Sequence, residues 1–482
     1  MPEGYVSWSS SSRPPEEGAN GHRMEIFGGR RNRSVSLPSE EKGVYDPGMT
    51  SEQISSHDSW IPPRLPAVQG TVQMDGSKSV AQRVLFNSVL SAGDSELVGV
   101  PDNEDLQIFI AALRNLGCEI EGELPGPLRV RGTGGVLAGG DRQLDLGLNG
   151  TAMRFLTALS ALREGETRID GATHRPIRPL IDKLRELGCD AQCLEPGEGP
   201  PVRVRGGTWT GNKVVLQAAT SSQFTSALML LAPHLAQGLH IRLVGPISSR
   251  PYIDLTAAVL RAFGIEVQLT AREITVKSGK ILRYGKIRIE ADASAAAFPL
   301  CAAAITSGDV TVEGVGSASL QGDRAIGEIL SEMGCPVQIE PQSIRVSGPP
   351  VRAISRAMAG NPDLVPAVSV VAAFARGESV FSGVSHLRVK ESDRLEVLCR
   401  GMCSVGIRAE VRGDLLRVVG SDGADLVAAD LDPHGDHRMA MAFALLALRI
   451  PGTRVLQPGC VVKSDRQFFR RLEGLLVERE MS

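Results

Sequence analysis

The chain has 482 residues, of which 42% are hydrophobic and 22% are charged, and its formal net charge is -3 at pH 7. These values are typical of a globular protein and exclude a general electrostatic attraction to nucleic acid or to an anionic membrane. No apolar run approaches the roughly 18 residues of a membrane span, and the eight cysteines contain no CxxC pair, so we expect a cytoplasmic protein with reduced thiols and no metal or disulfide framework.

Residues 1–60 differ in composition from the rest of the chain. They are rich in Ser, Pro, Gly and mixed charge, and they show neither a helical nor a strand period. The segment has no apolar core of a secretory signal, and acidic residues such as Glu16 and Glu17 argue against a transit peptide. We expect a disordered N-terminal extension.

A helix end of one kind recurs along the remaining chain. Apolar residues three apart are followed by glycine and then by an alternating, strand-like run, as in Leu113–Ile120. Glycine favours the left-handed conformation that ends a helix. The five glycines are separated by 70 to 76 residues: Gly117, Gly188, Gly264, Gly334 and Gly406. Together with a final helix over Asp465–Glu478, this period predicts internal duplication into six units, each with several strands and two helices.

The segment Gly76-Ser-Lys-Ser79 precedes an apolar-periodic run and predicts a helix start. Lys78, Ser79 and Arg83 would converge there on an anion such as phosphate. The order of residues is not that of a Walker loop. A solvated helix start is the alternative interpretation of this motif alone.

Three further segments of the first half carry polar groups at turns. Asn149 and Gly150 lie in a turn that leads into a helix, with Arg154 nearby, and Arg175 lies on a loop. Hydroxyl and amide side chains mark two more helix starts, at Ser221, Ser222 and Gln223 and at Ser249. None of these segments is specific alone.

The second half carries stronger signals. Asp363 precedes an apolar helix, and five charges crowd into 388–394 directly after a strand-like run. On a helix Lys390 and Arg394 would share a face, although a salt-bridged exposed helix is the alternative. His434 and His437 suggest a metal only weakly, because no third ligand is in view and the adjacent Arg438 would repel a cation.

Taken together and in order, the segments GSKS, NGTAMR, SSQF, RPYID, LRVKESDR and DHRMAMA resemble those of the 5-enolpyruvylshikimate-3-phosphate (EPSP) synthases, over about 65–476. The resemblance implies an α/β fold of two similar domains, each of three βαβαββ repeats arranged as an inside-out α/β barrel, with the active site in the interdomain cleft. One domain would comprise 76–290, and the other 61–75 with 291–482.

The resemblance also implies the reaction. The enolpyruvyl group of phosphoenolpyruvate would pass to the 5-hydroxyl of shikimate 3-phosphate with release of phosphate, by addition and elimination, on the shikimate pathway to chorismate and the aromatic amino acids. It implies a monomer with these two small-molecule substrates, no cofactor, no metal, and no nucleic-acid or membrane partner.

By the same resemblance, each site residue receives a role. Asp363 would be the proton acceptor and Glu391 the proton donor, with Lys78 also catalytic. The residues for shikimate 3-phosphate would be Lys78, Ser79, Arg83, Ser221, Ser222, Gln223, Ser249, Asp363, His386 and Lys390. Those for phosphoenolpyruvate would be Lys78, Asn149, Gly150, Arg175, Gln223, Arg394, Arg438 and Lys463.

The sequence departs from the family pattern at three places. Asp75 replaces a proline and would place a carboxylate beside the phosphate site. Leu148-Asn149 replaces Asn-Ala or Asn-Ser, so the amide that helps to orient phosphoenolpyruvate, close to where glyphosate binds, is shifted by one residue. The segment 171–175 looks shorter than the family's loop.

These departures leave open a paralogous enolpyruvyl transferase acting on another cyclic alcohol. The branch that acts on UDP-N-acetylglucosamine is disfavoured, because the loop before Arg175 lacks its reactive cysteine. A non-catalytic protein that binds phosphorylated metabolites is a third alternative, although Asp363, Lys390 and Glu391 are all present.

Overall fold

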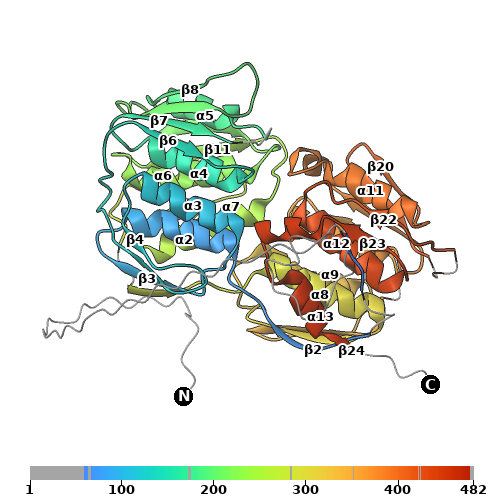
Figure 1. Cartoon of the computed structure of the whole chain (residues 1–482). Coiled ribbons are helices and arrows are strands. Elements are labelled where there is room, and N and C mark those ends of the chain that lie inside the picture. The colour runs from blue at the N-terminus through green and yellow to red at the C-terminus, as the bar shows by residue number, and fades with distance from the viewer. Residues whose placement is uncertain are drawn as a thin grey trace, which may run out of the picture.

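The chain forms two lobes that lie side by side (Figure 1), each with a hydrophobic core of its own. The computed structural model describes residues 59–62, 67–171, 175–282, 285–350, 352–421, 423 and 425–477. Within these residues, no helix has both the length and the apolar character that a membrane crossing requires.

The sheet of one repeat is the same in almost every unit. An outer strand runs parallel to its neighbour, and two further strands follow antiparallel, as in the order β6-β7-β9-β8. The first lobe has three such sheets, the other two being β14-β3-β5-β4 and β10-β11-β13-β12. Their strands are β3 (Ser95–Val98), β4 (Ile120–Glu121), β5 (Leu128–Val130), β6 (Arg142–Asp145), β7 (Glu166–Asp170), β8 (Asp190–Cys193), β9 (Val202–Arg205), β10 (Lys213–Gln217), β11 (Leu239–Val244), β12 (Val267–Leu269), β13 (Glu273–Val276) and β14 (Gly285–Arg288).

The second lobe repeats this plan with the sheets β16-β17-β15-β2-β24, β18-β19-β21-β20 and β1-β23-β22. The strands are β1 (Ser59–Trp60), β2 (Ala67–Gln73), β15 (Asp309–Glu313), β16 (Val337–Ile339), β17 (Ser343–Ser347), β18 (Ser355–Ala357), β19 (Glu378–Ser382), β20 (Ala409–Arg412), β21 (Leu415–Val419), β22 (Asp430–Leu431), β23 (Arg454–Leu456) and β24 (Leu476–Val477).

In both lobes the helices that fill the core are buried almost all round, as expected for helices that are covered on every side. The first lobe contains α2 (Lys78–Leu90), α3 (Glu104–Asn115), α4 (Gly150–Ser160), α5 (Arg178–Glu186), α6 (Ser222–Leu231), α7 (Arg250–Ala262) and the 3-10 turn η1 (Ala232–His234), with α2, α4 and α6 innermost. The second contains α8 (Ala293–Thr306), α9 (Ile326–Glu332), α10 (Val365–Ala372), α11 (Arg394–Ser404), α12 (His437–Arg449), α13 (Phe468–Gly474) and the 3-10 turns η2 (Gly322–Ala325), η3 (Pro362–Leu364), η4 (Ser385–Val389) and η5 (Pro458–Lys463), with α8, α10 and α12 innermost.

The recurring helix ends predicted from the sequence are confirmed. Each of the five glycines lies two residues after a helix and has a φ between 85° and 100°. Side chains with a Cβ rarely adopt this conformation, so glycine lets each helix stop and the chain turn into the next strand.

The chain passes between the lobes at two adjacent segments. Strand β2 pairs with β15 of the second lobe, whereas β14 pairs with β3 of the first. The two crossings are joined by backbone hydrogen bonds, from Ser77 N to Glu290 O (2.7 Å) and from Asp292 N to Asp75 O (2.8 Å). A Cβ at Gly76 would lie 1.9 Å from the Gly99 carbonyl oxygen, so only glycine fits there. We propose domain boundaries at these crossings, with 76–290 as one domain and 61–75 plus 291–482 as the other.

Two expectations about the chain ends are wrong. Ser59 and Trp60 do not belong to a disordered extension, because they form β1 against β23 and the Trp60 side chain is fully buried; residues 1–58 lie outside the described residues. The final helix is also shorter than Asp465–Glu478. It ends at Gly474, and Leu476–Val477 instead pairs with the edge of β2.

Candidate active site

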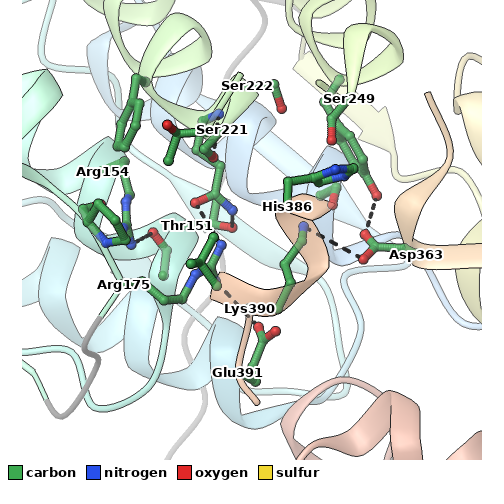
Figure 2. Close-up of a pocket in the computed structure, with 18 of the residues that line it drawn as sticks. Thr151, Arg154, Arg175, Ser221, Ser222, Ser249, Asp363, His386, Lys390 and Glu391 are labelled. Carbon is green, nitrogen blue, oxygen red and sulfur yellow. Dashed lines mark hydrogen bonds and ion pairs between the residues drawn. The ribbon is translucent and has the colours of Figure 1, made fainter. Parts of the chain in front are cut away.

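A cleft between the lobes collects the N-terminal ends of several core helices. Its lining includes the first residues of α2, α4 and α6 from one lobe and of α11 and α12 from the other, together with η3. Backbone N–H groups and the helix dipole make each such end favourable for an anion. In Figure 2, Thr151, Arg154 and Arg175 face Lys390 and Glu391 across this space.

The cleft is strongly cationic although the chain as a whole is not. Seven Lys and Arg side chains line it against three carboxylates, which leaves an excess of four positive charges. Fixed cations in a poorly solvated cleft attract and hold polyanions. The cleft is therefore suited to ligands that carry several negative charges.

Asp363 lies among cations at the start of η3. Its carboxylate accepts hydrogen bonds from Tyr252 Oη (2.8 Å) and Arg394 Nη1 (2.9 Å), and Arg438 Nε lies 3.4 Å away. Burial alone raises the pKa of Asp363, but Arg438, Lys390 and Arg394 outweigh it and hold the pKa well below its usual value. Asp363 is thus an ionised carboxylate.

Glu391 lies on the loop between η4 and α11. It contacts Arg394 Nη2 (2.8 Å) within its own lobe and Arg175 Nη1 (3.4 Å) across the cleft. Burial raises the pKa of Glu391, yet Arg394 and Arg175 dominate and lower it well below its usual value. Arg175 also donates to Gln223 Oε1 at 3.4 Å, which links this pair to α6.

Arg394 joins the two candidate catalytic carboxylates. Besides Asp363 and Glu391, its guanidinium contacts Asp436, the N-cap of α12, through Nε at 2.7 Å. Arg394 and Asp436 are both almost completely buried. A buried arginine held by three carboxylates has a fixed position, so Asp363 and Glu391 keep a fixed separation.

Asp105 pairs with two lysines at the other end of the cleft. Its carboxylate lies 2.8 Å from Lys78 Nζ and 3.3 Å from Lys463 Nζ, and Lys463 also donates to the Leu148 carbonyl oxygen at 3.0 Å. Lys78 and Lys463 come from different lobes, so this contact also joins the lobes.

Two buried arginines, Arg83 and Arg154, lie on the first-lobe side of the cleft. Arg83 donates to Thr256 Oγ1 (2.8 Å) and to the Ser79 carbonyl oxygen (2.8 Å), and burial lowers its pKa to about 10. Arg154 donates to the Gly150 carbonyl oxygen at 2.8 Å, and burial lowers its pKa.

Two histidines in the cleft are neutral at pH 7. Burial, reinforced by Lys390, lowers the pKa of His386 to about 4. Burial and then Lys78 lower the pKa of His437 well below its usual value. In the part of the chain that the structure describes, no group of three or more His, Cys, Asp or Glu is placed to hold a metal.

The structure brings most of the predicted site residues together. The cleft is lined by Lys78, Ser79, Arg83, Gly150, Arg175, Ser221, Ser222, Gln223, Ser249, Asp363, His386, Lys390, Glu391, Arg394 and Arg438. Lys463 reaches it through Asp105. Asn149 does not line it, because its side chain caps α4, accepting from Ala152 N (2.9 Å) and donating to the Asp105 carbonyl oxygen (2.7 Å).

Two local expectations are corrected. Lys390 and Arg394 do not share a helix face, since residues 390–393 form a loop and α11 begins only at Arg394. Asp75 does not add a carboxylate to the phosphate site, because its side chain pairs with Arg471 at 3.0 Å. Residues 172–174 of the loop expected to be short lie outside the described residues.

Several cleft residues were not among the predicted set. Asp105 is the clearest case, because an acidic residue in the first turn of a helix normally signals only a favourable helix dipole. Tyr252, Thr151, Arg154 and His437 also line the cleft. The sequence motifs contain Tyr252 and Arg154, but they do not show that these side chains point into the cleft.

Two repeat-built lobes with a cationic cleft and two arginine-bridged carboxylates between them form the arrangement expected of an enolpyruvyl transferase. Residues 64–472 match the family model of EPSP synthase (3-phosphoshikimate 1-carboxyvinyltransferase). The chain belongs to this family, which confirms the resemblance drawn from the sequence motifs.

Similar proteins support this membership. The 3-phosphoshikimate 1-carboxyvinyltransferases of Yersinia ruckeri and Nitrosomonas europaea are 35% and 34% identical to the chain, over 85% and 86% of it and 97% of each relative. The EPSP synthase structure from Acinetobacter baumannii has a TM-score of 0.72 at 27% identity and covers 87% of this chain and 98% of that one.

A more distant structure shares the fold alone. The enolpyruvyl transferase NikO from Streptomyces tendae has a TM-score of 0.68 at 16% identity and covers 86% of this chain and 96% of that one. The predicted fold, two similar α/β domains of repeated units, is therefore confirmed.

Proposed function

We propose that this enzyme transfers the enolpyruvyl group of phosphoenolpyruvate to the 5-hydroxyl of shikimate 3-phosphate and releases phosphate. The observation that carries the proposal is the pair Asp363 and Glu391, bridged by Arg394, in a cleft with an excess of cations from both lobes. Each substrate carries a phosphate and a carboxylate, which is the charge that such a cleft binds.

In the addition step, Glu391 donates a proton to the methylene carbon of phosphoenolpyruvate. The acceptor hydroxyl oxygen attacks the neighbouring carbon while Asp363 takes the hydroxyl proton. The product is a tetrahedral intermediate that bears both the phosphate and the new C–O bond. In the elimination step Glu391, which is a carboxylate after the addition, takes a proton from the methyl group, and the C–O bond to phosphate breaks, which restores the double bond.

Before reaction the two carboxylates need different protonation states: Asp363 must be ionised and Glu391 must carry a proton. Asp363 is already ionised, as an acceptor must be. Glu391 is ionised too, because Arg394 and Arg175 lower its pKa. Bound phosphate and carboxylate groups would engage these cations, raise the pKa of Glu391 and let it take up the proton that it donates.

The remaining residues divide between the two substrates. Hydroxyl and amide groups of α6 and of the start of α7 support a role with shikimate 3-phosphate: Ser221, Ser222, Gln223 and Ser249, with Lys78, Ser79, Arg83, His386 and Lys390. The cations around Glu391 and Asp363 support a role with phosphoenolpyruvate: Arg175, Arg394, Arg438 and Lys463, with Gly150 and with Lys78 and Gln223 shared between the two substrates. We propose further that the enzyme acts as a monomer in the cytoplasm.

Phosphate release from phosphoenolpyruvate tests this function directly. Release should require shikimate 3-phosphate and should not occur with a UDP-sugar. The Glu391→Gln variant serves as the control for a contaminating phosphatase. Equal release without an acceptor, or release only with another cyclic alcohol, would reject the proposed acceptor.

A further inference from the structure

Arg471 of α13 links two chain segments that carry cleft lysines. Its guanidinium donates through Nη2 to Asp465 and through Nη1 to Asp75 at 3.0 Å. Asp465 follows Lys463 by two residues, and Asp75 precedes Lys78 by three. These lysines are the two that contact Asp105.

The ion pair between Arg471 and Asp465 is buried. The Asp465 side chain is only 4% exposed, and its carboxylate accepts from Arg471 and from Gln467 N at 3.0 Å. Burial raises the pKa of Asp465 and Arg471 opposes that effect. A buried carboxylate that loses its cation is strongly unfavourable, so the segment would rearrange to hydrate it.

The ion pair between Arg471 and Asp75 lies at a rigid part of the chain. Asp75 lies at the crossing between the lobes, where its carbonyl oxygen accepts from Asp292 N and where the adjacent Gly76 has no space for a Cβ. The Asp75 side chain is 51% exposed, so its pairing with Arg471 can be removed without opening the core.

We propose that Arg471, held between Asp75 and Asp465, is a positioning residue that fixes Lys463 against Asp105 and the Leu148 carbonyl oxygen. Arg471 does not line the cleft, and its buried partner Asp465 lies two residues after Lys463. This inference rests on the proposed function, in which Lys463 serves phosphoenolpyruvate.

The Arg471→Gln variant should lower kcat/KM for phosphoenolpyruvate about tenfold, the size expected for one weakened contact to a charged ligand. Its kcat and its KM for shikimate 3-phosphate should stay unchanged. Arg470→Gln is the matched control, because Arg470 is an exposed neighbour on the same helix. Asp75→Asn removes only the exposed ion pair with Arg471. It should lower kcat/KM for phosphoenolpyruvate by less than Arg471→Gln does and leave thermal unfolding unaffected.

A double-mutant cycle with Lys463→Met separates positioning from general damage. In the Lys463→Met background, Arg471→Gln should have no further effect on kcat/KM for phosphoenolpyruvate. An equal loss in both backgrounds, or a loss of thermal stability with unchanged kcat/KM, would overturn the inference. If Arg471→Gln does not fold, Asp75→Asn decides, and an unchanged kcat/KM there overturns it.

A readout that needs no activity distinguishes this inference from the proposed function. Lys463 is 6% exposed, so its acetylation by acetic anhydride, followed by mass spectrometry, should be slow in the wild-type enzyme and faster in Arg471→Gln. A wild-type enzyme that releases no phosphate would reject the proposed function alone. Equal Lys463 labelling in the two proteins would reject the positioning role alone.

Discussion

The turn before α4 contains Leu148 and Asn149, and the structure gives these two residues different contacts. The Leu148 side chain is 44% exposed, and its carbonyl oxygen accepts from Lys463 at the cleft. Asn149 is instead fixed as the helix cap. The family pattern has its amide at position 148 and not at 149, so we predict that Leu148→Asn alone strengthens phosphoenolpyruvate binding.

The expected size follows from one new hydrogen bond to a charged ligand. Such a bond is worth about 1.5–3 kcal/mol, or roughly ten- to a hundredfold in affinity. The KM for phosphoenolpyruvate should fall by about tenfold or more, and glyphosate inhibition should strengthen in parallel. Turnover at saturation should change little, because ground-state binding alone is altered.

Asn149→Ala provides the contrast. It removes the cap of α4, which costs about 1 kcal/mol, and it leaves the Asp105 carbonyl oxygen without its 2.7 Å partner. Thermal unfolding should therefore occur at a lower temperature. Steady-state kinetics with phosphoenolpyruvate and glyphosate titration, run on both variants, test the assignment. If Leu148→Asn changes neither constant while Asn149→Ala changes both, the side chain at 148 does not face the substrate and our reasoning is refuted.

Three further predictions follow from the cleft and the core. Glu391→Gln and Asp363→Asn should each lower kcat by about 10²-fold or more with folding retained; near-normal turnover in steady-state assays would remove that residue from the mechanism. Activity should survive prolonged EDTA treatment and desalting, since the cleft's own cations supply the positive charge; a loss that a divalent ion restores would contradict this. Burial lowers the pKa of His234 and of His386 to about 4, so the unfolded chain binds more protons between pH 6.5 and 4, and each histidine should lower the unfolding free energy by about 2 kcal/mol at pH 5. Urea unfolding at pH 7.5 and 5 checks this, and a His234→Gln variant with an equally steep pH dependence would disprove it.

The repeat architecture was predictable because its signals are local. Each glycine after an apolar helix end carries its own conformational reason, and all five adopt the left-handed backbone. The passage of the chain between the lobes near β2 and β14 was predicted only from the family resemblance, because pairing between residues far apart leaves no local pattern.

The candidate site was predictable where side chain and backbone signals agree. Ser77 caps α2 at the helix start that the sequence predicts, and this places Lys78 and Ser79 at the cleft. Charge spacing was misleading at 388–394, because residues 390–393 form a loop and only Arg394 belongs to α11. Asp105 gave no signal because its partners lie 27 and 358 residues away in the chain.

In the proposed mechanism, Glu391 protonates the methylene carbon of phosphoenolpyruvate while Asp363 accepts the hydroxyl proton. Turnover in D2O tests it most directly. Addition of a deuteron creates a CH2D group, and loss of a proton on elimination leaves deuterium in the vinyl group of the product, which mass spectrometry detects. We expect deuterated product from the wild-type enzyme, and none formed above background by Glu391→Gln. Product that forms at the normal rate with no vinyl deuterium would contradict protonation of the carbon and, with it, the addition–elimination mechanism.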